Sequence, residues 1–127
     1  MEENKWKNQS FLNALKNALN GIKYTFKTQR NLKIQIVFAI LAIVLGLFLK
    51  LSITEWVILS LTIFLVLIVE LINTAIETTV DMFTMEYNEK AKNAKDASAG
   101  AVTLMAIASI VVGIFLFIPK IINLISL

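Results

Sequence analysis

Long apolar runs alternate with short polar segments along this chain, and three of the runs can cross a bilayer as helices. We expect these spans at about residues 32–50, 53–80 and 99–119, with a tight turn that makes the first two an antiparallel hairpin. The polar segment 81–98 contains no Pro or Gly, so we expect it to prolong the helices on either side. The pattern predicts an all-α membrane protein in which residues 1–127 form a single domain.

A different pattern precedes the first span, over about residues 8–28. Apolar side chains recur there every three or four positions, and lysines and asparagines occupy the other side. This is typical of a basic amphipathic helix that lies on a membrane surface. A helix packed against the bundle, with no role at the lipid, is the alternative. The apolar positions are Phe11, Leu15, Leu19, Ile22 and Phe26.

Composition and charge agree with a membrane protein and suggest its orientation. Hydrophobic residues make up 57% of the chain, which is far above the usual share in a soluble domain. Lys and Arg gather before residue 34 and in segment 81–98, whereas the opposite ends of the spans carry only Lys50 and Lys120. The positive-inside rule then places the N-terminus and segment 81–98 in the cytoplasm. No nucleic-acid recognition module is visible, so nucleic acid is not an expected partner.

Polar side chains follow one face of the second span near its end. Glu70, Asn73, Glu77 and Asp81 fall within an arc of roughly 80° on a helix. Ionising a carboxyl group in hydrocarbon costs at least about 2.5 kcal/mol, so stability does not explain the stripe. We therefore treat it as a candidate site. Intramembrane carboxylates mark ion and proton pathways as well as catalytic centres, and both classes stay open at this point.

The chemistry available to the chain is limited. Histidine and cysteine are absent, which removes the commonest general base and the commonest zinc ligands. Glycine-rich nucleotide loops are missing too, so phosphate binding would use side chains and a metal. Lys95, just before the third span, is placed to reach back toward the level of Glu77. A cation beside carboxylates at a membrane surface suggests a phosphate and a divalent metal.

The run ELINTAIETTVD at 70–81, with AKD at 94–96 and AGAV at 99–102, resembles the small prokaryotic diacylglycerol kinases, whose Gram-positive branch acts mainly on undecaprenol. The resemblance covers nearly the whole chain. It implies a homotrimer in the bacterial inner membrane that phosphorylates a lipid alcohol with ATP and Mg²⁺, in active sites shared between subunits. Undecaprenol is the expected acceptor and diacylglycerol the alternative. Three functions of other classes remain as alternatives: a small oligomeric transporter, a proton-conducting helix bundle and a structural membrane adaptor.

The same resemblance implies roles for particular residues. Glu70 would be the general base for the lipid hydroxyl, and Asn73 would orient that carboxylate or the substrate. Glu77 would hold Mg²⁺. The other implied contacts are Asp81, Glu86, Tyr87 and Asn88 near the nucleotide, Lys95 on phosphate, Asp96 beside the nucleoside, and Ser98 near the lipid.

Two positions depart from the family pattern. Gln29 stands where the family usually has a glutamate that gives the metal a second carboxylate, and Gln35 stands where the branch often has histidine. A glutamine oxygen can ligate Mg²⁺, but without charge. Weak metal binding, use of another carboxylate and loss of activity are the three open outcomes. The intact acidic stripe and the presence of Lys95 and Asp96 favour a working enzyme that uses Glu77 and Gln29 as metal ligands.

Overall fold

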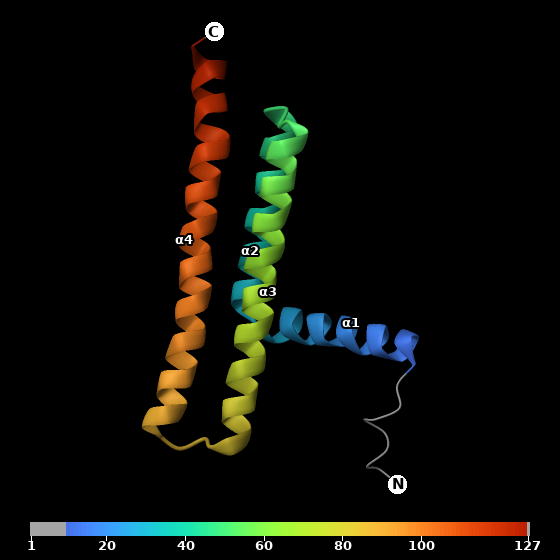
Figure 1. Cartoon of the computed structure of the whole chain (residues 1–127), viewed down its shortest axis with the longest axis vertical. Coiled ribbons are helices and arrows are strands. Elements are labelled where there is room, and N and C mark those ends of the chain that lie inside the picture. The colour runs from blue at the N-terminus through green and yellow to red at the C-terminus, as the bar shows by residue number, and fades with distance from the viewer. Residues whose placement is uncertain (1–9, 127) are drawn as a thin grey trace.

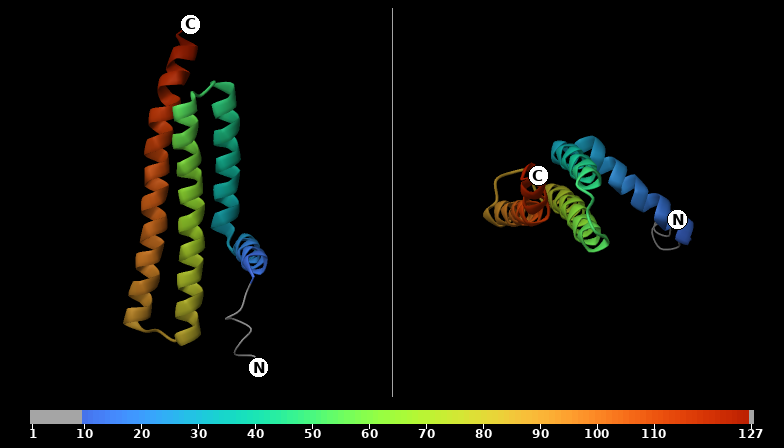
Figure 2. Two further views of the ribbon diagram at one scale, coloured as in Figure 1. Left: turned by 45° about the vertical axis from the view of Figure 1, so that its right-hand side comes forward. Right: turned by 90° about the horizontal axis from the view of Figure 1, so that it is seen from above.

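Four helices make up residues 10–126, which are the part of the chain that the computed structural model describes. Helix α1 (Phe11–Thr28) lies crosswise, whereas α2 (Arg30–Phe48), α3 (Ile53–Phe83) and α4 (Glu89–Ile125) run side by side as a bundle (Figures 1 and 2). The last three helices are long and apolar enough to cross a membrane. The predicted architecture of one N-terminal helix and three spans is therefore confirmed.

Helix α1 begins at a polar cap and ends at a single extended residue. The side chain of Ser10 accepts a hydrogen bond from the backbone N–H of Asn13 (3.3 Å), as is usual at a helix start. Gln29 has an extended backbone (φ −107°, ψ 114°), so the chain changes direction between α1 and α2. The apolar side chains of α1 are exposed, as a membrane-facing side would be. The predicted surface helix included residues 8–9, and the predicted orientation used Lys5 and Lys7. These residues lie outside the described part of the chain.

A tight turn closes the hairpin between α2 and α3. Lys50 has a φ of 56° in the left-handed region, which reverses the chain within a few residues. The side chain of Ser52 accepts from the Glu55 N–H (3.2 Å), and the Glu55 carboxylate accepts from the Ser52 N–H (2.7 Å), which together form a capping box. Glu55 also pairs with Lys120 (3.2 Å), so α4 is tied to the same end of the bundle.

The bundle has an apolar core near this turn. Leu51, Leu59 and Leu116 form a buried cluster from the turn, α3 and α4. Gly46 permits α2 to approach the turn and α3 closely, because an added Cβ would come within 2.9 Å of the side chains of Leu51 and Trp56. The hairpin end of the molecule is thus held by ordinary hydrophobic packing.

The other end of the bundle is polar. Helix α3 continues to Phe83 and α4 begins at Glu89, so only residues 84–88 of the polar segment are not helical. The Asn88 side chain accepts from the N–H groups of Lys90 (3.0 Å) and Ala91 (3.1 Å) and caps α4. Both helices project past α1 at this end (Figures 1 and 2). Four buried polar residues lie between this turn and the apolar core: Glu70, Asn73, Thr74 and Ser98.

Candidate active site

Glu70 is the most deeply buried large side chain in the described part of the molecule, with 1% of its surface exposed. Its Oε2 atom accepts a hydrogen bond from Nε2 of Gln35 on α2 (3.4 Å). The hydroxyl of Thr74 donates to the backbone carbonyl of Glu70 (2.9 Å) and supports the helix there. Oε1 of Glu70 and Oε1 of Gln35 are buried without a hydrogen-bond partner. A buried carboxylate with one free oxygen is an arrangement that can accept a proton from a ligand.

Gln35 was missed as a site residue by the sequence reasoning, which named it only as a departure from a family pattern. One signal did mark it. Gln35 is the only polar side chain in the apolar run 34–49. A polar group inside a span usually faces a partner in the bundle, and here that partner is Glu70.

Asn73 connects α3 to α4 and to the next carboxylate along the stripe. Its Nδ2 donates to Oε1 of Glu77 (3.3 Å), and its Oδ1 accepts from the hydroxyl of Ser98 (2.6 Å). Asn73 and Ser98 are both buried, whereas Glu77 is half-buried. In the structure the Asn73 amide therefore contacts the Glu77 carboxylate. The sequence instead suggested that Asn73 would orient Glu70 or the substrate.

Two ion pairs lie at the polar end. Lys95 pairs with Asp81 (2.5 Å). The sequence suggested that Lys95 would reach the level of Glu77, and Asp81 lies one helical turn beyond that level. Lys92 pairs with Asp96 (2.5 Å) along α4. All four side chains are 41% exposed or more, and exposed ion pairs stabilise proteins by only about 0–1 kcal/mol. A phosphate group can therefore displace Asp81 from Lys95 at little cost to the fold.

A pocket of about 340 Å³ surrounds these ion pairs at the α3–α4 turn. Its walls come from the last turn of α3, the connecting residues 84–88 and the first two turns of α4. Glu70, Glu77 and Ser98 are not among its lining residues, so the predicted site divides between this pocket and the buried cluster. The pocket brings together every residue that was expected near the nucleotide apart from Glu77: Asp81, Glu86, Tyr87, Asn88, Lys95 and Asp96.

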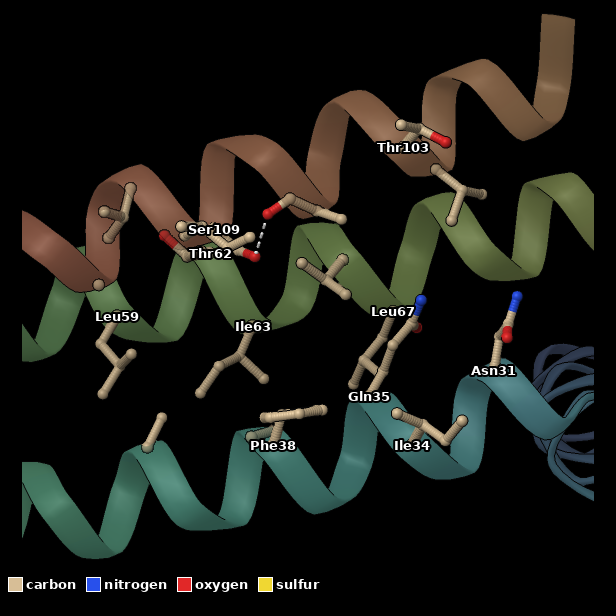
Figure 3. Close-up of a pocket in the computed structure, with 18 of the residues that line it drawn as sticks. Asn31, Ile34, Gln35, Phe38, Leu59, Thr62, Ile63, Leu67, Thr103 and Ser109 are labelled. Carbon is tan, nitrogen blue, oxygen red and sulfur yellow. Dashed lines mark hydrogen bonds between the residues drawn. The ribbon is translucent and has the colours of Figure 1, made fainter.

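A larger groove of about 570 Å³ runs along α2, α3 and α4 (Figure 3). Its walls are mainly apolar, and Asn31 and Gln35 lie toward the end nearest α1 (Figure 3). The hydroxyl of Ser109 is used within α4, where it donates to the Ala106 carbonyl (2.7 Å). One end of the groove is therefore polar and is connected to Glu70 by the hydrogen bond from Gln35. The rest of the groove is apolar, so its lining suits an amphiphilic ligand.

Metal ligands are few. No group of three or more carboxylate, histidine or cysteine side chains gathers within residues 10–126. Mg²⁺ in phosphate-transfer sites is usually held by one or two carboxylates together with water and substrate phosphates, so Glu77 fits that requirement. Gln29 is half-buried at the α1–α2 corner and makes no capping hydrogen bond with its side chain. Within the described residues no hydrogen bond joins Gln29 to Glu77.

Sequence comparisons point to one family. A sequence model of the family described as prokaryotic diacylglycerol kinase matches residues 16–117. An undecaprenol kinase of Bacillus subtilis is 41% identical over 110 residues, which cover 87% of this chain and 89% of that protein. A diacylglycerol kinase of Synechocystis is 39% identical over 126 residues, covering 98% and 72%. A diacylglycerol kinase of Haemophilus influenzae is 33% identical over 107 residues, covering 84% and 91%.

Proposed function

This chain belongs to the prokaryotic diacylglycerol kinase family, and from that premise we propose that it transfers the γ-phosphoryl group of ATP to the hydroxyl of a membrane lipid alcohol. Undecaprenol is the acceptor that we favour and diacylglycerol is the alternative, because relatives with both names match the chain. The observation that carries the proposal is the burial of Glu70, which has one unpartnered oxygen and lies beside the polar end of an apolar groove.

In the proposed reaction the lipid chain lies in the groove and its hydroxyl approaches Glu70. The free Oε1 of Glu70 accepts the hydroxyl proton while the lipid oxygen attacks the γ-phosphorus. The bond between that phosphorus and the bridging oxygen breaks, so ADP leaves and the lipid phosphate forms. Phosphoryl transfer needs positioning and charge neutralisation more than covalent chemistry, which suits a site of a few side chains.

The nucleotide would occupy the pocket at the α3–α4 turn. Lys95 would leave Asp81 for a phosphate group, and the carboxylate of Asp96, which pairs with Lys92, would accept a hydrogen bond from a nucleoside hydroxyl. Glu77 would hold Mg²⁺, with the side-chain oxygen of Gln29 as a second, uncharged ligand. The bound metal would neutralise phosphate charge. Asn73, which accepts a hydrogen bond from Ser98 of α4, donates to the Glu77 carboxylate and would hold it in place for the metal.

We propose further that the nucleotide pocket faces the cytoplasm of a bacterial cell, with the chain in the inner membrane. The charge distribution along the sequence supports this orientation, and ATP is available on that side. The exposed apolar face of α1 would then lie on the cytoplasmic membrane surface. By resemblance to the family, three copies would assemble and share their active sites.

The direct test is ATP consumption by the purified protein in lipid bilayers, with and without an added lipid alcohol. We expect MgATP turnover only with the alcohol present. Glu70→Gln should lower turnover by about a hundredfold or more, since general bases contribute roughly 10²- to 10⁴-fold. Glu89→Gln makes the same change at an exposed position and should leave turnover unchanged.

Two outcomes would contradict this function. Turnover of Glu70→Gln within about tenfold of the unaltered protein would remove Glu70 as the general base. Proton flux through the protein in sealed vesicles, without ATP turnover under any lipid condition, would favour the conducting helix bundle.

A further inference from the structure

We propose that Gln35 is a positioning residue for the phosphorylation of the lipid: its amide holds one oxygen of the Glu70 carboxylate and leaves the other for the lipid hydroxyl. This inference rests on the proposed function and assigns to α2 a part in the site. The hydrogen bond from Nε2 of Gln35 to Oε2 of Glu70 (3.4 Å) joins α2 to α3 at this depth.

The Glu70 carboxylate depends on α2 for its orientation. Among the described residues, Gln35 supplies the only hydrogen bond to that carboxylate, since Thr74 reaches the backbone carbonyl and not the side chain. A glutamate side chain has three rotatable bonds, so one directional contact decides where its free oxygen lies. Removing the amide would leave Glu70 buried but free to change rotamer.

The unpartnered atoms show that the pair is arranged for a ligand. Most buried polar atoms in proteins have a hydrogen-bond partner, yet Oε1 of Glu70 and Oε1 of Gln35 are both buried and unpaired. Two acceptors left open in one contact pair call for a donor, and a lipid hydroxyl is a donor. Gln35 also lines the groove, so the amide connects the Glu70 carboxylate with the space proposed for the lipid chain (Figure 3).

The amide is chemically suited to this part. It donates a hydrogen bond in a fixed plane and carries no charge, so it does not compete with Glu70 for the substrate proton. A role in packing alone would be served by an apolar residue, as at every other position of the run 34–49 apart from Gly46. The polar side chain at position 35 is therefore explained by its contact with Glu70.

The experiment compares Gln35→Leu, Gln35→His and the control Asn123→Leu in the full-length protein reconstituted in lipid. Asn123→Leu makes the same kind of change at an exposed amide of α4. The leucine variant should lower kcat roughly ten- to hundredfold, the loss expected for a hydrogen bond to a charged group, with unchanged KM for MgATP and for the lipid. Histidine keeps an N–H donor and should restore most of kcat. An unchanged kcat in Gln35→Leu, or no recovery in Gln35→His, would overturn the assignment.

A second measurement does not depend on turnover. The infrared band of the Glu70 carboxyl group is identified as the band that Glu70→Gln removes. It should shift in Gln35→Leu and stay in place in Asn123→Leu, because only the first change removes its hydrogen bond. An unshifted band would refute the positioning role even in an active enzyme. Absence of lipid phosphorylation by the unaltered protein would instead refute the proposed function, while the band still decides whether Gln35 holds Glu70.

Discussion

Asn73 joins α3 to α4 in the buried part of the site. One side of its amide donates to Glu77, and the other accepts from Ser98 on α4. Both ends of a buried amide are thus satisfied, which fixes its plane and with it the position of the Glu77 carboxylate. The second oxygen of Glu77 is not used by Asn73 and remains for a cation. Because α4 contributes Ser98, the relative position of α3 and α4 sets the geometry of this carboxylate.

Glu77→Gln should raise the Mg²⁺ concentration needed for half-maximal turnover. The substitution keeps the size of the side chain but removes the negative charge that we assign to the metal. A contact to a charged group contributes about 1.5–3 kcal/mol, which corresponds to roughly ten- to a hundredfold in Mg²⁺. Turnover measured against Mg²⁺ at saturating ATP checks this, with Glu89→Gln as the control for loss of one exposed carboxylate. Identical Mg²⁺ curves for both variants would remove Glu77 from the metal site.

Gln29→Glu should lower the Mg²⁺ requirement or increase activity. A second carboxylate at the α1–α2 corner would compensate more of the metal's charge, by about 1–2 kcal/mol or roughly five- to thirtyfold in affinity. Asn20→Asp adds the same charge to an exposed position of α1 and serves as the control. Superimposable curves for Gln29→Glu and the unaltered protein would mean that Gln29 lies outside the metal's ligands.

At the scale of the elements, helix periodicity predicted the stripe on α3 but not its partners. Glu70, Asn73, Glu77 and Asp81 lie on one face because the angle per residue is a property of any α-helix. Which side chain meets that face depends on how α2 and α4 are rotated, and this is set by packing along their whole length. The contact of Gln35 with Glu70 was therefore not predictable from either helix alone.

The pairing of Lys95 shows a second limit. Sequence signals leave the ends of helices uncertain by a few residues, and a shift of one residue rotates the following helix by 100°. Helix α4 begins at Glu89 after a connection of five residues. With this start, Lys95 pairs with Asp81 and not with Glu77. The three spans were predictable because an apolar run of about 20 residues tolerates such errors at its ends.

Gly46→Leu should destabilise the hairpin of α2 and α3. A Cβ at this position comes within 2.9 Å of the side chains of Leu51 and Trp56, and a leucine adds three more carbon atoms. Overpacking of this kind costs about 1–3 kcal/mol, whereas Gly46→Ala should cost less because the better helix propensity of alanine offsets part of the strain. Unfolding in mixed detergent micelles measures both effects. Gly21→Leu, where nothing lies within 4 Å, is the control and should not destabilise the fold.

At the scale of the whole molecule, the candidate site extends along one helix from a buried carboxylate to an exposed one. Glu70 and Asp81 are eleven residues apart, or about 16 Å along α3. The groove lies beside the buried end of this stretch and the nucleotide pocket surrounds its exposed end. Glu77 and Asn73 stand between them, where the γ-phosphate would have to meet the lipid oxygen. In the proposed reaction a single long helix would therefore hold the acceptor and the nucleotide at different depths.

This difference in depth predicts which lipid is the better substrate. The hydroxyl of undecaprenol is attached directly to its apolar chain, so reaching the buried Glu70 removes no other polar group from water. Diacylglycerol carries two ester groups close to its hydroxyl, and burying them without donors costs free energy. The groove offers few donors near that end: the polar side chains there are Asn31, Gln35 and Thr103, and the hydroxyl of Thr103 already donates to the Ala99 carbonyl (3.0 Å). Undecaprenol should therefore show the higher kcat/KM when both lipids are assayed at the same mole fraction.

A saturated long-chain alcohol separates this explanation from recognition of the isoprenoid chain. It has a hydroxyl at the chain end and no ester, so it should be phosphorylated better than diacylglycerol if ester burial limits the reaction. A preference for diacylglycerol over both alcohols would contradict the argument, and would mean that donors reach the ester groups from surfaces that a single copy of the chain does not present.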